Sequence, residues 1–127
     1  MAVREAFTIG QVLTAEEMTN VATAMIAINA QTGTTYTFQL SDDGKLCTFD
    51  NAASITATIP PNSSVAYGIG TQLNLMALDA GVVTITAGAG VTIRSDGSKL
   101  KLNAQYAVAT CLKIASDTWV AVGNLKA

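Results

Sequence analysis

The sequence predicts a mainly β protein: an antiparallel β-sandwich or barrel of about nine short strands, preceded by an extended N-terminal arm and one short helix. From Thr34 onward, apolar and polar residues alternate with the period of two that marks a half-buried strand. Turn signals such as Asp43-Gly44, Pro60-Pro61 and Asp96-Gly97 separate these segments. Many short strands at close spacing are typical of sandwiches and barrels. With 127 residues, the chain is long enough for one domain with a single core.

Residues 1–33 are expected to form the arm and the helix, with a role in attachment or oligomerisation. The arm, residues 1–13, contains apolar side chains at Val3, Phe7, Ile9, Val12 and Leu13. Thr14 and Glu17 have the spacing of a capping box at a helix start. The helix should cover roughly residues 15–28, because one helical face carries Met18, Val21, Ala22, Met25 and Ile26.

Residues 34–127 are expected to form the β-domain. Alternation at Tyr36, Phe38 and Leu40 predicts a first strand, and Asp43-Gly44 predicts a hairpin to a return strand at 45–50. The next strand ends at Pro60-Pro61. Further strands are predicted at 71–78, 82–87, 90–95, 99–102, 106–114 and 119–122. The segment 106–114 is apolar on both faces, which predicts a central strand.

A phrase that begins with Gly81-Val-Val-Thr-Ile-Thr returns as Gly90-Val-Thr-Ile-Arg. A solenoid needs at least three similar rungs, so two copies favour a hairpin joined by the Ala-Gly-Ala-Gly turn. Val83, Ile85, Val91 and Ile93 should then face the core. The glycines lack the following helix and the lysine that a phosphate-binding loop requires.

Charge is scarce on this chain. Charged residues make up 13% of the sequence, about half the usual share, while hydrophobic residues make up 50%. Such a surface protects a free monomer poorly against association, which favours faces covered by other copies or by a larger assembly. The net charge of −2, without a large cluster of Lys and Arg, predicts no nucleic-acid partner. Lys99 and Lys101 should lie on the solvent face of a short strand. No apolar run approaches the roughly 20 residues that span a bilayer, so we predict no membrane partner.

The residues that carry most enzyme chemistry are absent or badly spaced. The chain has no histidine, which removes the Ser-His-Asp and Cys-His systems and most zinc sites. Asp42 and Asp43 are adjacent and are expected in a solvated turn, pointing different ways. Four other aspartates near strand ends lack the spacing of a calcium loop: Asp50, Asp79, Asp96 and Asp117. We therefore predict no catalytic, cofactor-binding or metal-binding residue and no cofactor, and we expect that the protein is not an enzyme.

Cysteines and aromatic residues are expected mainly in the core. Cys47 and Cys111 lie in apolar strand patterns, where small buried thiols are favoured over a disulfide, although pairing stays open. Core packing is predicted for Tyr36, Phe38, Phe49, Tyr106 and Trp119. Tyr67, in the loop 60–70, is the aromatic residue expected to be exposed.

The candidate partner-binding residues are Val3, Phe7, Ile9 and Val12 of the arm, Met18 and Met25 of the helix, and Tyr67 of the loop. The arm and helix could cover the β-domain of their own chain as a lid, or attach it to another chain. Methionine adapts to irregular partner surfaces, which suits attachment. Both alternatives remain open from the sequence.

The order of several motifs resembles a known module. A Tyr-Thr strand leads into Ser-Asp-Asp-Gly-Lys, and an Ile-Pro-Pro-Asn-Ser loop, the Gly-Val-Thr-Ile phrase and a closing Thr-Trp-Val strand follow. Over about residues 34–125 this order resembles a small β-module of tailed-bacteriophage virion proteins, found in capsid decoration proteins, head fibres and tail appendages, usually as trimers. The resemblance implies a structural role without catalysis.

Three functions follow as expectations from the resemblance and the size of the chain. The first is a capsid decoration (cement) protein, a homotrimer on the virion surface that is made in the host cytoplasm and binds the major capsid protein. The alternative is a head- or tail-fibre adhesion module that binds a host surface glycan, through the loop 60–70. A polysaccharide depolymerase is the third and is disfavoured by the missing histidine.

Overall fold

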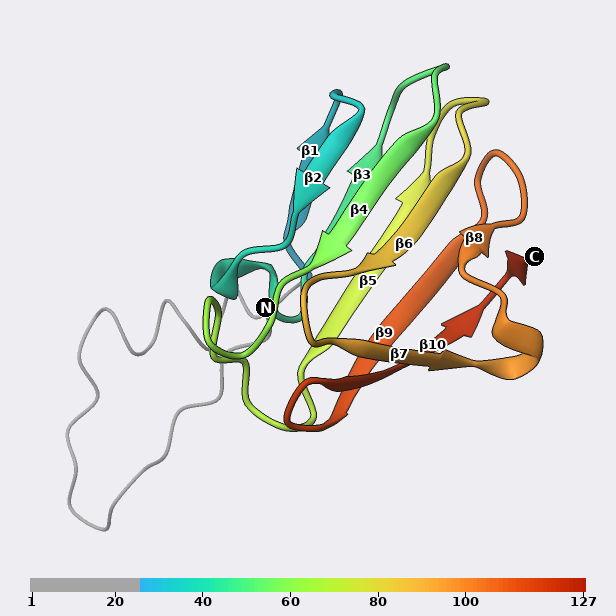
Figure 1. Cartoon of the computed structure of the whole chain (residues 1–127). Coiled ribbons are helices and arrows are strands. Elements are labelled where there is room, and N and C mark those ends of the chain that lie inside the picture. Colours follow the sequence, from blue (N-terminus) through green and yellow to red (C-terminus); the bar gives the residue numbers. More distant parts are fainter. Residues whose placement is uncertain (1–25) are drawn as a thin grey trace, which may run out of the picture.

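A computed structural model describes residues 26–127, which form two β-sheets packed face to face (Figure 1). The six-stranded sheet has the order β1 (Ile28–Gln31), β3 (Leu46–Phe49), β5 (Gln72–Ala77), β9 (Val108–Ala115), β10 (Thr118–Gly123) and β7 (Thr92–Ser95). The five-stranded sheet has the order β11 (Leu125–Lys126), β8 (Lys101–Leu102), β6 (Val83–Ala87), β4 (Ile55–Ile59) and β2 (Thr35–Thr37). Two short 3-10 helices, η1 (Leu40–Asp42) and η2 (Asp96–Ser98), lie in the connections.

The first half of the described chain winds into a coil. It passes from one sheet to the other with every strand, so that β1, β3 and β5 lie side by side and parallel in one sheet. In the other sheet β2, β4 and β6 are parallel in the same way. Residues 28–87 therefore form three two-stranded coils of a short β-solenoid, β1–β2, β3–β4 and β5–β6.

The second half closes this solenoid with mostly antiparallel strands. In the six-stranded sheet, β9 pairs with both β5 and β10 in antiparallel fashion, and β7 adds parallel to β10 at the edge. In the five-stranded sheet, β8 pairs antiparallel with β6 and with β11. The two sheets continue past the last coil with the C-terminal strands.

Close backbone stacking holds the coils together, and two glycines make it possible. A Cβ atom on Gly81 would lie 2.1 Å from the carbonyl oxygen of Ala53 and 2.2 Å from that of Asn51. On Gly88 it would lie 2.7 Å from the carbonyl oxygen of Ile59. The amides of Gly81 and Gly88 donate hydrogen bonds to the carbonyls of Asn51 (3.1 Å) and Ile59 (2.8 Å). Each glycine thus sets one turn of the third coil directly on the corresponding turn of the second.

The core lies between the two sheets and follows from the period-two pattern. In β4, Ile55, Ala57 and Ile59 point inward and are buried, and in β6 Val83 and Ile85 do the same. The largest fully buried side chains are Trp119, Phe38, Phe49, Ile55, Ile59, Leu73, Leu75, Ile85 and Leu102. Burial of alternate apolar residues from both sheets is the main stabilising contribution to such a fold.

The mainly β class with two packed sheets is confirmed, but the predicted antiparallel pairing is wrong for five strand pairs. The pairs β1–β3, β3–β5, β2–β4, β4–β6 and β7–β10 are parallel. Alternation indicates that one side of a strand is buried, but it carries no information about the direction of the neighbouring strand. Residues 26–127 contain eleven strands, where about nine were expected.

Both predicted hairpins are absent from residues 26–127 for the same reason. The turn at Asp43-Gly44 leads from the five-stranded sheet to β3 in the six-stranded sheet. Gly88-Ala-Gly90 likewise carries the chain from β6 to β7 in the opposite sheet, with Gly90 at φ 81°. A solenoid was disfavoured because only two similar rungs occur in the sequence, and this expectation is wrong for residues 28–87. Backbone ladders between parallel strands need matched spacing and turns, however, and the three coils have these without similar sequences.

Of the other predictions, some are confirmed and others are wrong. The central position of the predicted strand 106–114 is confirmed, because β9 lies between β5 and β10. The predicted core position of Tyr106 is wrong, because this residue precedes β9 and is 63% exposed. Lys101 is exposed beside the buried Leu102, as predicted for a short surface strand. The predicted helix is wrong at its end, because residues 26–27 are not helical and β1 begins at Ile28. Its other residues, 15–25, lie outside the described part of the chain.

Candidate functional site

Six of the seven candidate partner-binding residues lie outside the described residues: Val3, Phe7, Ile9, Val12, Met18 and Met25. The seventh, Tyr67, is described, and its expected exposure is wrong, since only 4% of the residue is accessible. Its ring packs edge-on against Trp119, with centroids 5.4 Å apart, and its hydroxyl donates to the carbonyl of Gln39 at 2.7 Å. The loop 60–70 thus folds inward over one end of the core.

A buried lysine fixes the same loop. The Nζ atom of Lys113 on β9 donates to the Tyr67 carbonyl at 2.7 Å and to Oδ1 of Asn62 at 2.8 Å. The backbone amide of Asn62 donates to Oδ1 of Asp117 at 2.7 Å. Lys113 was not among the candidate residues, although its place in the alternation after Ala109 and Cys111 indicates an inward side chain. These contacts leave no exposed aromatic platform for a glycan at Tyr67.

A second buried polar cluster surrounds Asp42, whose expected solvated position is wrong. The Asp42 carboxylate accepts from the Tyr36 hydroxyl at 2.6 Å, the Asn29 amide group at 2.9 Å and the Gln39 backbone amide at 2.8 Å. Asp43 is half-buried beside it. Burial, together with the hydrogen bond to Asp42, raises the pKa of Tyr36 well above its usual range. Because its oxygens are engaged by three donors, Asp42 serves the fold.

The thiols are buried too. Cys47 and Cys111 are free and fully enclosed, which confirms the predicted buried thiols and leaves no disulfide between them. Burial raises the pKa of each to about 12, with the nearby Asp42 adding to the effect at Cys47. A thiol with this pKa is almost entirely protonated near neutral pH and is a poor nucleophile.

Residues 26–127 contain no group of three or more His, Cys, Asp and Glu side chains placed to hold a metal ion. Among the same residues, no helix has the length and apolar character needed to cross a membrane.

The outer face of the six-stranded sheet is rich in exposed aliphatic side chains. We call it the six-stranded face and define it by the outward side chains of β1, β3, β5, β9 and β10. Its members alternate with buried residues such as Leu73, Cys111 and Trp119. None of them is charged: Ile28, Ala30, Leu46, Thr48, Gln72, Asn74, Met76, Val108, Thr110, Leu112, Ile114, Val120 and Val122.

Strand register makes this face continuous. Leu112 on β9 lies between Gln72 on β5 and Val120 on β10. A second row runs across five strands through Ile28, Leu46, Asn74, Thr110 and Val122. Several members are open to solvent, with Ile28 58%, Val122 53%, Ile114 46% and Val108 44% exposed. The nearest charge in the register is Arg94 on the edge strand β7, opposite Val120.

The outer face of the five-stranded sheet has a different chemistry, and we call it the threonine face. Every outward position of β2, β4 and β6 is a threonine, and the parallel register aligns them in two rows. The rows are Thr35, Thr56, Thr84 and Thr37, Thr58, Thr86. Lys101 continues the first row, with Lys126 opposite it on β11. Hydroxyls and cations make this face well suited to solvent.

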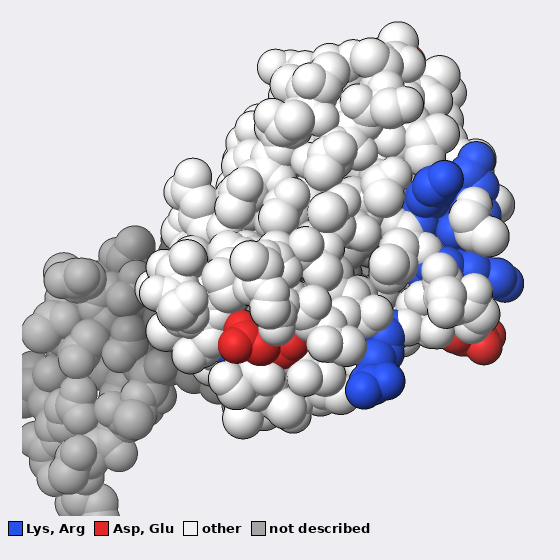
Figure 2. Space-filling view, viewed as in Figure 1, with Lys and Arg blue, Asp and Glu red and all other residues white. Residues whose placement is uncertain are grey.

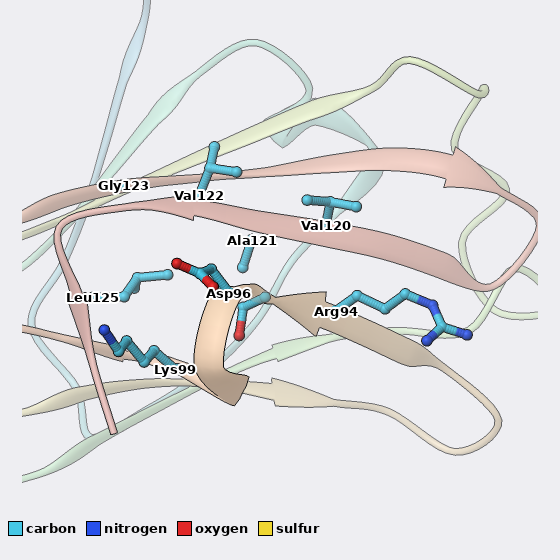
Figure 3. Close-up of a pocket in the computed structure, with 9 residues that line it drawn as sticks. Arg94, Asp96, Lys99, Val120, Ala121, Val122, Gly123 and Leu125 are labelled. Atoms are coloured by element: carbon cyan, nitrogen blue, oxygen red, sulfur yellow. The ribbon is translucent and has the colours of Figure 1, made fainter.

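A groove of about 440 Å³ lies where the two sheets meet at β7, β10 and β11 (Figure 3). Val120, Val122 and Leu125 provide its apolar lining, and Arg94, Asp96 and Lys99 its charged side chains. Figure 2 shows that Lys and Arg side chains gather at this end of the molecule, whereas most of the remaining view is uncharged. Val120 and Val122 belong to both the groove and the six-stranded face, so the two surfaces are continuous.

Three comparisons with known proteins, against family models, curated proteins and solved structures, gave no match to this chain.

Proposed function

We propose that the chain is a structural protein of a tailed-bacteriophage particle, a capsid decoration protein that binds the shell of major capsid protein and stabilises it. The observation that carries the proposal is the six-stranded face, which is broad, apolar and free of charge. Surfaces of this kind are covered by protein in the working state. The motif order over residues 34–125, which resembles virion β-modules, supports the same conclusion.

The chemistry of the described residues supports a role in assembly. The buried carboxylate of Asp42 and the ammonium group of Lys113 are both engaged in internal hydrogen bonds. Cys47 and Cys111 are enclosed. In the proposed role, copies of the chain assemble as homotrimers and contact neighbouring capsid subunits. Apolar burial at those contacts, at roughly 25 cal/mol per Å², adds to the cohesion of the shell.

Attachment to the shell is assigned to the N-terminal arm, so removal of residues 1–13 tests the proposal. Purified particles lacking the protein would be mixed with the full chain or with the truncated chain and separated by density-gradient centrifugation. We expect the full chain to migrate with the particles and the truncated chain to stay at the top, with an unchanged β-sheet circular dichroism spectrum. A full chain that fails to bind particles contradicts the decoration role, and truncated chain that still binds contradicts the role of the arm.

An adhesion module of a head or tail fibre is the second candidate. The observation that favours it is the groove, in which Arg94 and Lys99 could hold an anionic sugar. Tyr67 no longer supports it, because its ring is buried against Trp119. A glycan array probed with the purified chain distinguishes this candidate. Specific binding of acidic glycans, lost on Arg94→Ser, favours adhesion over decoration.

A further inference from the structure

We infer that the six-stranded face is a self-association interface, covered by other copies of this chain. The inference deepens the self-association of the proposed function by naming the surface through which copies meet. It does not depend on a phage particle, because it concerns only the purified chain.

The solvation of the face suits a protein partner. Most of its exposed members are aliphatic, among them Ile28, Val108 and Val122, and Gln72 is its exposed polar member. The polar groups at its centre are already satisfied within the chain. The hydroxyl of Thr110 donates to Oδ1 of Asn74 at 2.8 Å, and Nδ2 of Asn74 donates to the Lys45 carbonyl at 3.1 Å. A second protein surface therefore displaces water here without leaving these side-chain groups unpaired.

The absence of charge also favours contact between two copies through this face. Such a contact brings together no charged side chain from its five strands. A contact through the threonine face would place four lysines, Lys101 and Lys126 of each chain, in one interface. Like charges in an interface cost several kcal/mol unless they are paired. Self-association therefore favours the six-stranded face and leaves the threonine face in solvent.

The size of the face also allows such a contact. Four interstrand spacings span about 19 Å, and strands of four to eight residues span about 14–27 Å, which gives roughly 350–400 Å² before side-chain relief is counted. This lies within the roughly 300–600 Å² of the largest patch on a typical monomer, which is often functional. It is about half of the approximately 800 Å² per partner of a standard interface, so we expect a reversible complex.

Another copy also suits this face better than residues 1–25 of the chain. That segment carries Arg4, Glu5, Glu16 and Glu17. The six-stranded face offers no charged partner for them except Arg94 at its edge. An identical face brings neither charge nor an unsatisfied group of this kind, so we assign the surface to a second copy.

The test is the molar mass of the full chain by light scattering after size exclusion, from about 1 to 200 μM in 0.15 and 0.5 M NaCl. We expect at least twice the 13.1 kDa of one chain, and three times that mass if the homotrimer is correct. The mass should persist in high salt, because apolar contacts are not screened. A chain that stays at 13.1 kDa throughout overturns the inference.

Two substitutions locate the interface. Leu112→Glu places a charge at the centre of the face, and Val122→Glu places one at a half-exposed position near the end of β10. We expect each to weaken association at least tenfold. The matched control is Thr56→Glu, an exposed position on the parallel strand β4 in the threonine face, which should keep the parent mass.

Folding is monitored in every variant by near-ultraviolet circular dichroism of Trp119. If Leu112→Glu unfolds, the molar mass of Val122→Glu tests the interface by itself. Val122 is 53% exposed, so the fold should tolerate a glutamate there. An oligomer that persists in Val122→Glu but dissociates in Thr56→Glu would show that copies associate through the threonine face. That result overturns the inference. Failure of this test leaves particle binding to be judged by the gradient experiment.

Discussion

At the scale of single residues, the main lesson is where the charged side chains lie. Asp42 and Lys113 are 1% and 3% exposed, and each sits in a cluster of hydrogen bonds that ties a connection to the sheets. A buried charge is tolerated only when its hydrogen-bonding capacity is met. Both residues therefore hold η1 and the loop 60–70 in place at one end of the sandwich.

Asp42→Asn tests the first cluster. The asparagine retains one acceptor oxygen and places an NH₂ group where Oδ atoms now accept from three donors. We expect a loss of about 1–3 kcal/mol in the free energy of unfolding, measured with urea. Asp43→Asn is the control, since no hydrogen bond from residues 26–127 engages that carboxylate, and it should change stability by less than about 0.5 kcal/mol. Equal losses of unfolding free energy in the two variants would contradict a specific contribution of this cluster to stability.

The buried thiols predict a loss of stability at alkaline pH. The pKa of Cys111 is raised to about 12 by burial, above the usual value near 9. The unfolded chain therefore releases this proton at lower pH than the folded chain does. The protonated Cys111 thiol therefore contributes to the free energy of unfolding. This contribution is complete below about pH 9 and is lost as the pH rises toward 12, at about 1.4 kcal/mol per pH unit.

This prediction is checked by urea unfolding between pH 8 and 10.5. Cys111→Ala should lower stability at pH 8, because it leaves a cavity, and should make the decline above pH 9 shallower than in the parent chain. Cys47, Tyr36 and Tyr67, whose pKa values are also raised by burial, keep part of the decline in both proteins. An identical slope for both would refute the assignment to Cys111.

At the scale of elements, period-two alternation located most strands correctly and said little about how they pair. The predicted strands at 71–78, 82–87 and 90–95 contain β5, β6 and β7. Their partners depend on which connections cross between the sheets. Gly88-Ala-Gly90 looked like a hairpin turn because the two phrases beside it are similar, yet it is a crossing between sheets.

Gly81→Ala tests whether coil stacking stabilises the fold. The added methyl group would lie 2.1 and 2.2 Å from two backbone oxygens of the preceding coil, which must move away. We expect a loss of at least about 1–3 kcal/mol in the free energy of unfolding. Gly68→Ala is the matched control, because its Cβ atom meets nothing within 4 Å, and it should be neutral or slightly stabilising. A similar melting temperature for the two variants would argue against tight stacking.

At the scale of the whole molecule, the two outer faces account for the scarcity of charge. Six threonines and two lysines keep the threonine face solvated. The six-stranded face, by contrast, has aliphatic groups and internally paired amides and hydroxyls. Low charge in the sequence predicted a covered surface somewhere, but only strand order brought Leu46, Thr110 and Val122 into one row.

Local composition and alternation were enough to predict the β class, the burial of the cysteines, the central position of the strand 106–114 and a covered surface. These features depend on a few neighbouring residues. The parallel coils, the inward positions of Tyr67, Asp42 and Lys113, and the separation of the two outer faces became visible only in the folded chain. Those features depend on which distant segments share a backbone ladder, and a single chain's pattern does not encode that choice locally.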